Sequence, residues 1–350
     1  MEKKVAVAMS GGVDSAGAAL LLKKAGYSVS GVTLQLHHCR DLPGGLAEEA
    51  AAARENAAAI GVEHTVLDLC TEFRERVMGR FVSEYVAGRT PNPCIDCNRE
   101  IKFGALLDWA LEQGNDYLAT GHYARVAFDE VSGRWQLLRG RDPRKDQSYM
   151  LYQLKQEQLA HILLPVGEYE KPLIRALAAE AGLDNAARPD SQDICFIPDG
   201  DYMAFLQEWG VEPQPGDFVD RTGRVLGQHK GQECYTLGQR KGLGVSVGEP
   251  VYVVGKDAAA GTVVLGPNEA LFSREVTAER VNFISIPALT APMRVTAKTR
   301  YSQSEAAAVL EPLEDGCVRL VFDEPQRAVT PGQAVVFYDG ERVVGGGTIR

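Results

Sequence analysis

The stretch Ser10-Gly11-Gly12-Val13-Asp14-Ser15 decides the fold of this chain. The apolar run Val5 to Met9 precedes it and predicts a short buried strand. The alanine- and leucine-rich run Ala16 to Leu22 follows it and predicts the start of a helix. Two glycines allow a tight turn and a close approach to a ligand, and the N–H groups of a helix start favour an anion such as phosphate. The sequence therefore predicts a phosphate-binding junction, with an ordinary turn between strand and helix as the alternative.

The loop differs from two common nucleotide-binding loops. No Gly-Lys-Ser or Gly-Lys-Thr follows its glycines, as it does in a Walker A loop. The G-x-G-x-x-G spacing of dinucleotide-binding loops is absent as well. The hexapeptide instead resembles the SGGxDS loop of the ATP pyrophosphatases, the PP-loop. That resemblance implies that the α-phosphate of ATP is attacked, that pyrophosphate leaves, and that a substrate is activated as an adenylate.

Length and composition set wide limits. A chain of 350 residues predicts two or three domains, and 45% hydrophobic with 24% charged residues is ordinary for a globular protein. No apolar run is long enough to span a membrane and no secretory leader precedes the first strand, so we expect a cytoplasmic protein with no membrane partner. A net charge of −10 does not suggest a nucleic-acid binder, but such binding depends on local patches. Basic residues gather at 134–145 and at 221–241, either as solvated faces or as RNA contacts.

Strand and helix signals alternate through the first part of the chain. We expect helices over about 16–24, 46–60 and 71–86, with Thr71 as a cap, and strands over 28–36, 64–69 and 116–119. This alternation predicts a parallel sheet that binds ligands at the carboxyl ends of its strands, where the opening loop falls. The stretch His37-His38-Cys39 follows the second strand at the same end. It is a candidate metal site, although adjacent histidines lack a strong ligand spacing.

Seven cysteines are an odd number, which in a cytoplasmic chain predicts no structural disulfide framework. Cys97 closes a C-x-x-C pair within Pro91 to Asn98, and a helix is expected from the end of that stretch. At a helix N-terminus the dipole lowers the pKa of a thiol, so Cys97 is predicted to be reactive, with Arg99 adding to the effect. The pair is a redox pair, half of a metal site, or one catalytic cysteine with a bystander. Cys195, taken alone in the loop 188–198, is predicted to be a packing residue.

The second half of the chain changes character. A hairpin is expected over 124–139, followed by the basic and polar loop 144–149, whose composition suits RNA contacts, and by a largely helical stretch over 149–183. From about residue 213 glycine becomes frequent and valine runs alternate with polar residues, which predicts a small β-barrel or sandwich. The strands expected there are 276–281, 293–299, 317–322, 334–338 and 343–349. We expect three domains, over 1–202, 203–275 and 276–350.

These segments together resemble one family of PP-loop enzymes, the bacterial tRNA-specific 2-thiouridylases of MnmA type. The resemblance rests on Met9 to Ser15, Thr90 to Pro93, Cys97-Asn98, Ile101 to Phe103, Ala119 to Tyr123, Lys145 to Tyr149, Asp193 to Ile197 and Thr236 to Gly244. It implies an α/β fold: a parallel-sheet PP-loop domain like the adenine nucleotide α-hydrolases, a central module that contacts tRNA, and a C-terminal antiparallel β-barrel. It also implies ATP, Mg²⁺, tRNA and a sulfur-donor protein as ligands and partners.

The resemblance implies roles for individual residues. It implies ATP binding for Ala8, Met9, Ser10, Gly11, Gly12, Val13, Asp14, Ser15, Leu34 and Gly121. It implies a pocket for the target base at Asn92, Pro93 and Cys94, and tRNA contacts for His122, Lys145, Asp146, Gln147, Arg300, Tyr301 and Gln333. Cys195 is implied to carry sulfur from the donor as a persulfide, which Cys97 attacks, either releasing sulfide or leaving a transient Cys97–Cys195 disulfide. The implied products are 2-thiouridine at the wobble position of tRNA, AMP and pyrophosphate.

One position departs from the family pattern. Some members carry Asp, a candidate general acid or base, where this chain has Cys94. A thiol with an ordinary pKa of about 8.5 does not replace a carboxyl with one of about 3.9, and Asp96 is the nearest carboxylate. Cys94, Cys97 and Cys195 together admit an iron–sulfur site as an alternative, and Cys94 with Cys97 admits a zinc site. The rival functions are an iron–sulfur-dependent tRNA thiolase, a PP-loop synthetase acting on a small molecule, and a non-catalytic RNA-binding protein with ATP as a structural ligand.

Overall fold

The computed structural model describes residues 2–36, 46–183 and 194–350. Its N-terminal part is built on a five-stranded parallel sheet in the order β3-β2-β1-β4-β7. The strands are β1 Lys4–Ala8, β2 Ser28–Gln35, β3 Glu63–Asp68, β4 Tyr117–Ala119 and β7 Ile162–Leu163. The chain goes from β1 to β2 on one side and later to β4 on the other. The carboxyl end of β1 is therefore the switch point at which sheets of this kind form a ligand crevice.

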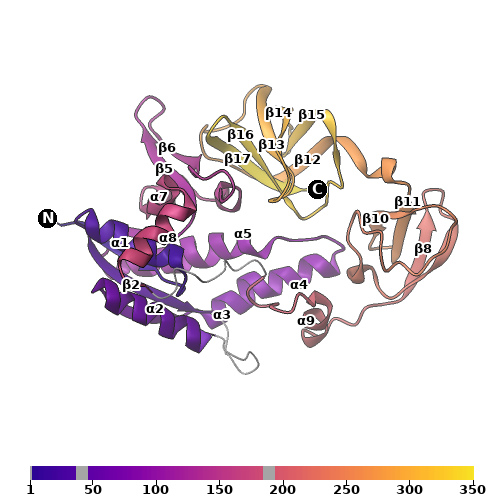
Figure 1. Ribbon diagram of the computed structural model, residues 1–350. Helices are drawn as coiled ribbons and strands as arrows, with labels where there is room; N and C mark the ends of the chain where they lie inside the picture. Colours follow the sequence, from indigo (N-terminus) through magenta and orange to yellow (C-terminus); the bar gives the residue numbers. More distant parts are fainter. Residues whose placement is uncertain (1, 37–45, 184–193) are drawn as a thin grey trace.

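Helices cover both faces of this sheet (Figure 1). Alternate residues of β1 point to opposite faces, and the apolar side chains on each face are buried under helices. Val5 and Val7 pack in one apolar cluster with residues of α1, α2 and α8, and Ala6 packs in another with residues of η2 and α6. The helical segments of this part are α1 Val13–Lys24, α2 Leu46–Ile60, α3 Cys70–Phe73, η1 Arg74–Met78, α4 Gly79–Val86, α5 Pro93–Cys97, η2 Asn98–Ala105, α6 Leu106–Glu112, η3 Ser148–Leu151, α7 Gln156–Leu159, η4 Pro165–Glu168 and α8 Lys171–Glu180.

Two helix starts differ from the expected ones. The helix expected from about Asn98 begins at Pro93, since proline suits the first position of a helix and the Asn92 side chain caps it by accepting the Cys94 N–H at 3.2 Å. The helix after β3 begins at Cys70, so Thr71 lies inside it and is not its cap.

Two strands were not expected. The stretch 149–183 contains β7, whose two residues pair with Leu118 and Ala119 of β4. Two residues are too few to show a strand pattern. Strand β14 (Ala306–Pro312) was also missed, because its run of alanines carries little strand preference.

The hairpin expected over 124–139 is confirmed, but it belongs to two parts of the molecule. Its strands β5 (Ala124–Asp129) and β6 (Arg134–Arg139) lie between β4 and β7 of the parallel sheet in the chain, yet β6 pairs with β17 of the C-terminal sheet at Leu138 and Arg342. The buried Arg125 side chain donates to Glu341 at 2.7 Å across the same boundary. The hairpin thereby joins the N-terminal domain to the barrel.

The chain continues through a central module into a closed barrel (Figure 1). The module holds a four-stranded sheet, β10-β11-β8-β9, with an apolar core around Phe218 and Tyr235. The barrel is antiparallel and closes because β12 pairs with β17 as well as with β15. The elements are α9 Tyr202–Glu208, β8 Gly216–Asp220, β9 Val225–His229, η6 Gln232–Cys234, β10 Tyr252–Asp257, β11 Thr262–Gly266, η7 Asn268–Leu271, β12 Phe272–Phe283, β13 Met293–Lys298, β14, β15 Val318–Arg327, β16 Ala334–Asp339 and β17 Arg342–Ile349. The predicted fold class is confirmed.

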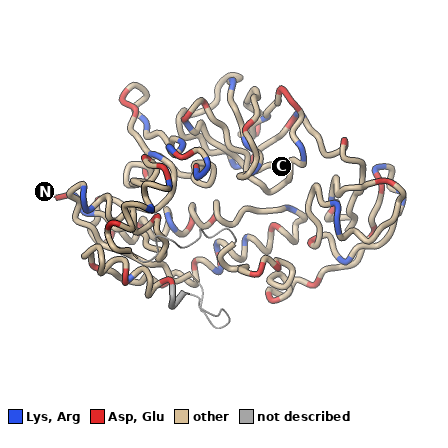
Figure 2. Tube along the Cα trace, in the orientation of Figure 1, with Lys and Arg blue, Asp and Glu red and all other residues tan. Residues whose placement is uncertain are grey.

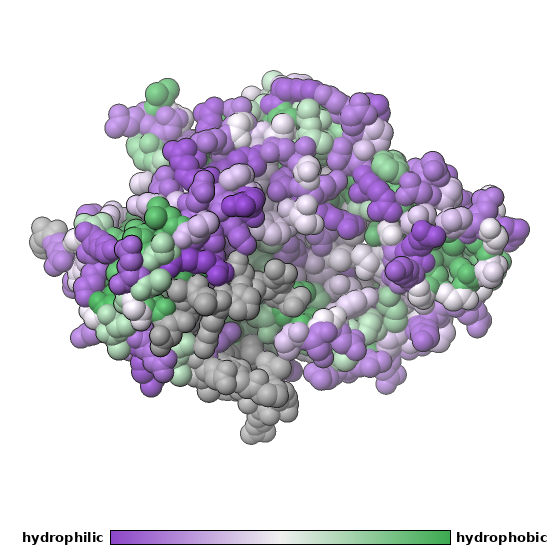
Figure 3. Space-filling view, in the orientation of Figure 1, coloured by the Kyte–Doolittle hydropathy of each residue, from purple (hydrophilic) through white to green (hydrophobic). Residues whose placement is uncertain are grey.

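Charged residues of both signs are spread along the described chain (Figure 2). Figure 2 shows Lys and Arg interspersed with Asp and Glu along most of the chain. The face drawn in Figure 3 is hydrophilic over much of its area. Among the described helices, none is both long enough and apolar enough to cross a membrane.

Candidate active site

The loop between β1 and α1 has the geometry of a phosphate cradle. Gly11 has a φ of +74°, which other residues rarely adopt, and a Cβ there would lie 2.8 Å from a backbone carbonyl oxygen of α2. Gly12 occupies the N-cap position of α1 and, as a glycine, has no side chain with which to cap that helix. The Ser15 hydroxyl accepts the Ser10 N–H at 3.2 Å and donates to the Gly12 carbonyl at 3.0 Å, which closes the turn. The N–H groups of this first turn suit a phosphate group, and phosphate binding here stays a prediction.

Gly121, which follows β4, packs directly on this loop. A Cβ on Gly121 would lie 2.7 Å from the carbonyl carbon of Asp14 and 2.7 Å from the nitrogen of Ser15. Only glycine fits there without a shift of the backbone. Two backbone segments thus line one cradle at the switch point of the sheet, and such a surface fits the phosphates of ATP.

The carboxylate of Asp14 is held from two sides at the edge of the cradle. The Tyr123 hydroxyl donates to its Oδ1 at 2.8 Å, and the Lys171 ammonium donates to its Oδ2 at 2.6 Å. The Lys171 side chain is 7% exposed and that of Asp14 is 31% exposed. Tyr123 lies within a motif quoted above but had no predicted role, and Lys171 was missed. A lysine 157 positions away in the chain has no sequence pattern that pairs it with Asp14.

The second strand of the sheet reaches the same edge. The Thr33 hydroxyl donates to the Met9 carbonyl at 2.7 Å and lies 2.8 Å from His64 Nε2, which fixes the start of the loop. Leu34 is half-buried and packs against the apolar cluster that contains Cys97. Leu34, which the resemblance assigns to ATP, therefore packs on the same apolar cluster that contains Cys97.

Cys97 lies inside a helix, not at its start. Because α5 begins at Pro93 and runs directly into η2, the thiol is about one turn along the helix and only 8% exposed, packed with Phe73 and Ile101. Burial raises the pKa of Cys97 to about 11, and the positive charge of Lys102 opposes that rise. The predicted dipole-lowered pKa is therefore wrong, because apolar packing outweighs the helix start.

Cys195 reaches the same region from a distant segment. It lies in a turn closed by a hydrogen bond of 2.8 Å from the Ile197 N–H to the Ile194 carbonyl. Its neighbour Phe196 packs on the cluster of Cys97 and meets Phe73 edge to face at 5.7 Å between ring centroids. Cys195 itself is exposed, so the prediction that it is a packing residue is wrong. Desolvation of its thiol, followed by the charges of Cys97 and Cys94, nevertheless raises the pKa of Cys195 to about 12. The two thiols, both free, are therefore electrostatic neighbours.

Cys94 completes a group of three neighbouring thiols. Desolvation raises its pKa as well, although the residue as a whole is exposed, and Lys102 again opposes the rise. Lys102 is thus the cation shared by Cys94, Cys97 and Cys195. Within residues 2–36, 46–183 and 194–350, no three His, Cys, Asp or Glu side chains are placed as ligands of one metal ion.

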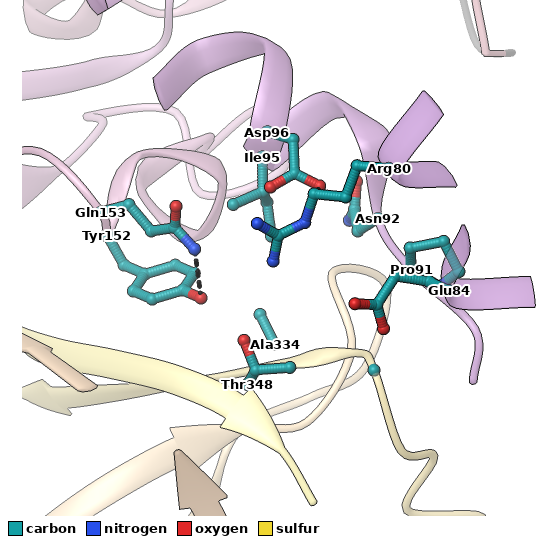
Figure 4. Close-up of a pocket in the computed structure, with 11 residues that line it drawn as sticks. Arg80, Glu84, Pro91, Asn92, Ile95, Asp96, Tyr152, Gln153, Ala334 and Thr348 are labelled. Atoms are coloured by element: carbon teal, nitrogen blue, oxygen red, sulfur yellow. Dashed lines mark hydrogen bonds and ion pairs between the residues drawn. The ribbon is translucent and has the colours of Figure 1, made fainter. Parts of the chain in front are cut away.

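Asp96, the carboxylate nearest to Cys94 in sequence, is engaged in ion pairs. Arg80 Nε lies 3.2 Å from its Oδ2, and Arg99 Nη2 lies 3.2 Å from its Oδ1. Figure 4 shows Asp96 and Arg80 facing each other in a small pocket that Asn92 also lines. Burial raises the pKa of Asp96, while the two arginines lower it. Both oxygens of Asp96 are therefore engaged in ion pairs, and Arg99 interacts with Asp96 rather than with Cys97.

The loop that leads into η3 carries three predicted tRNA contacts. Asp146 accepts the N–H groups of Gly140 and Ser148 at 3.1 Å each, so it organises the loop. The Gln147 side chain accepts the Tyr123 N–H at 2.9 Å. Lys145 is half-buried. The polar side chains of this loop are thus largely used for its own architecture.

His122 and the barrel residues predicted to contact tRNA occupy different environments. His122 is 8% exposed and its Nδ1 lies 2.7 Å from the Thr120 hydroxyl. Burial, and secondarily Lys102, lowers the pKa of His122 well below its ordinary value, so the ring is neutral at physiological pH. Arg300 donates to the Thr330 hydroxyl at 2.6 Å.

Tyr301 and Gln333 lie where the barrel faces the N-terminal domain. Tyr301 is 37% exposed and its ring lies 5.9 Å from that of Tyr149. The Gln333 side chain donates to the carbonyls of Thr90 and Pro91 at 2.8 and 3.2 Å. Gln333 therefore ties the barrel to the segment that enters α5, next to the predicted base pocket at Asn92, Pro93 and Cys94. Two other candidates, His37-His38-Cys39 and the polar stretch 188–193, lie outside the described residues.

The parallel sheet, the PP-loop cradle and the adjacent thiols define a HUP-domain protein with a PP-loop and two appended β modules. Family models match in three segments: the tRNA methyl transferase HUP domain over 3–199, the tRNA methyl transferase PRC-barrel domain over 203–267 and the aminomethyltransferase beta-barrel domain over 273–349. The chain belongs to the family of tRNA-specific 2-thiouridylases of MnmA type.

Relatives with that name match along their whole length. The chain is 52% identical to the tRNA-specific 2-thiouridylase MnmA of Acetivibrio thermocellus, over 100% of this chain and 99% of that protein. It is 52% identical to the protein of the same name from Heliobacterium modesticaldum, over 100% and 93%. It is 48% identical to that of Clostridioides difficile, over 100% and 98%.

Proposed function

We propose that this chain is an ATP-dependent tRNA-uridine 2-sulfurtransferase that makes 2-thiouridine at the wobble position and releases AMP and pyrophosphate. One observation carries the proposal: a PP-loop cradle and two free thiols, Cys97 and Cys195, lie at the same edge of one sheet. A PP-loop alone also serves synthetases of small molecules. Neighbouring thiols give the adenylate a sulfur nucleophile, and the names of the full-length relatives agree with that chemistry.

The cradle supports the activation step. The uncapped first turn of α1 and the backbone around Gly121 suit the phosphates of ATP. The C2 oxygen of uridine attacks the α-phosphorus, the bond to pyrophosphate breaks, and the base becomes adenylated. Mg²⁺, when bound, would neutralise charge on the leaving pyrophosphate, and the partly exposed carboxylate of Asp14 at the edge of the cradle would hold it.

The thiols support the transfer step. Cys195 carries a persulfide received from a sulfur-donor protein, and its terminal sulfur attacks C2 of the adenylated base while the C2–O bond to AMP breaks. The Cys97 thiolate then attacks Sγ of Cys195. The sulfur bound to C2 leaves with its electron pair as the thiocarbonyl of the product, and a Cys97–Cys195 disulfide remains. A thiol reductant supplies the two electrons that reset the pair.

The remaining residues are proposed to receive the tRNA. Cys94, Asn92 and Pro93 lie on the first turn of α5, and the target base enters beside them. Exposed parts of the loop around Lys145 and of Tyr301 contact the RNA, whereas Asp146, Gln147, Arg300 and Gln333 shape these surfaces through the bonds described above. The central module at 203–275 adds a further RNA contact. The reaction takes place in the cytoplasm, where tRNA and ATP are present.

A reconstituted reaction tests the proposal. The chain is incubated with ATP, Mg²⁺, a persulfide-loaded donor and an unmodified tRNA transcript, and the digested RNA is examined by mass spectrometry. We expect 2-thiouridine with one AMP formed per modified base. Cys195→Ser should keep AMP formation and lose persulfide-dependent transfer, whereas Cys234→Ser, a half-exposed cysteine of the central module, should keep both. The absence of thiolated nucleoside with the unaltered chain, under reducing and oxidising conditions alike, would refute the proposal.

A further inference from the structure

Two chains of hydrogen bonds connect Asp14 of the PP-loop to the loop at residues 140–147. The first runs through Tyr123. Its hydroxyl donates to Asp14 at 2.8 Å, its N–H donates to the Gln147 side chain at 2.9 Å, and its carbonyl accepts the Gln147 N–H at 2.8 Å. One residue of the loop is therefore bonded twice to a residue that holds the PP-loop carboxylate.

The second chain runs through Lys171. Its ammonium donates to Asp14 at 2.6 Å, and its backbone N–H donates to Asp142 Oδ2 at 3.3 Å. The other carboxylate oxygen of Asp142 accepts the Arg144 N–H at 3.0 Å, and the Asp142 carbonyl accepts the Lys145 N–H at 3.0 Å. The backbone of the loop, at Arg144, and the first residue of α8, Lys171, therefore both donate to the buried carboxylate of Asp142.

These connections lie in the protein interior. Tyr123 is 2% exposed, Asp142 is 1% exposed and Lys171 is 6% exposed. A Cβ on Gly140 would lie 2.7 Å from the Tyr123 carbonyl oxygen, so the loop backbone also rests on Tyr123. Buried hydrogen bonds do not exchange freely with water, and close-packed groups transmit displacement. A shift of the loop is therefore passed to the groups that hold Asp14.

The two ends of the connection face different ligands. On the loop, the side chains of Arg141 and Arg144 are 53% and 76% exposed. Arg141 lies 3.6 Å from Glu168 and 3.7 Å from Glu341, and Arg144 lies 3.6 Å from Asp142, but with this exposure both guanidinium groups stay accessible to the phosphates of a polyanion. At the other end, Asp14 is partly exposed beside the phosphate cradle. One contact network therefore joins a polyanion surface to the ATP site.

We propose that Tyr123 and Lys171 are positioning residues that couple RNA binding at the 140–147 loop to ATP binding at Asp14. The inference rests on the proposed function, since it takes the polyanion to be tRNA. RNA on the loop holds Gln147 and Asp142 in place, these hold Tyr123 and Lys171, and the two side chains hold the carboxylate in the orientation that the ATP complex needs. Linkage then requires that tRNA tighten ATP binding and that ATP tighten tRNA binding by the same factor.

Equilibrium binding measures this factor directly. The dissociation constant of an ATP analogue with a methylene bridge between the α- and β-phosphates is measured with and without an unmodified tRNA transcript. We expect tRNA to tighten binding to the unaltered chain. Tyr123→Phe keeps the ring and removes one hydrogen bond, so the coupling factor should fall by about 2- to 10-fold. Gln147→Ala should lower it too, although Gln147 does not touch Asp14.

A matched variant separates coupling from the loss of any tyrosine hydroxyl. Tyr117→Phe removes the hydroxyl that accepts from Lys3 at 3.2 Å at the surface, and the coupling factor should stay unchanged. Melting curves confirm that each variant is folded. An unaltered chain that binds both ligands with a factor of 1, or a factor unchanged in both Tyr123→Phe and Gln147→Ala, overturns the inference alone. An unaltered chain that binds ATP but no tRNA overturns the proposed function together with the coupling.

Discussion

Replacing Gly121 by alanine creates a steric overlap with the backbone of the PP-loop cradle. The added Cβ would lie 2.7 Å from backbone atoms of Asp14 and Ser15, whereas ordinary van der Waals contact begins at 3.4 Å. About 0.7 Å must therefore be absorbed by one of two backbone segments. Gly121 is not among the residues with positive φ, so steric overlap is the perturbation and backbone strain is not.

The expected effect follows from the size of that displacement. A misplacement of about 1 Å of reacting groups costs on the order of 100-fold in rate, so we expect kcat/KM for ATP to fall about 10- to 100-fold. The assay is pyrophosphate release at varied ATP with saturating tRNA. Gly255→Ala in β10 is the control, since a Cβ there meets Val264 at an ordinary 3.6 Å, and its kcat/KM should change less than about 2-fold.

The kcat/KM and the melting curve of the Gly121→Ala variant together test this prediction. A folded Gly121→Ala variant with the kcat/KM of the unaltered chain would mean that ATP does not use this cradle. If the variant has lost its cooperative melting transition, a low kcat/KM reflects unfolding. The affinity of the remaining folded fraction for ATP then decides whether the cradle is disturbed.

Three further predictions concern the thiols and the barrel. Because burial raises the pKa of Cys97 to about 11, its reactive thiolate grows about tenfold per pH unit, so single-turnover disulfide formation with persulfide-loaded Cys195 should accelerate from pH 7 to 9; a flat profile would contradict this. Lys102→Met removes the cation that lowers the thiol pKa values and should slow disulfide formation while AMP formation continues. Lys155→Met, at an exposed lysine, should leave the rates of both disulfide formation and AMP formation unchanged. Gln333→Ala removes both bonds to the segment before α5, and urea denaturation should show a loss of about 1–2 kcal/mol; unchanged stability would mean that this contact between barrel and helix is incidental.

Structural features that depend only on residues adjacent in the sequence could be predicted from the sequence. The PP-loop junction was predicted because glycines 11 and 12 are flanked by an apolar strand and an alanine-rich helix, and the structure has that junction. The hairpin at 124–139 and five of the six barrel strands were predicted for the same reason, since alternation and turns are local patterns. Strand β7 was missed because two residues become a strand only by pairing with β4.

The site required contacts between distant segments. The sequence by itself predicted a phosphate-binding loop at residues 10–15 and placed cysteines at 97 and 195 in the same chain. Only the tertiary structure decided that Phe196 brings Cys195 to Cys97, that burial raises both thiol pKa values, and that Lys171 and Tyr123 hold Asp14. The physical reason is that a backbone turn depends on the conformational preferences of adjacent residues, whereas desolvation, charge and hydrogen bonding at a buried group depend on whichever segments the fold packs around it.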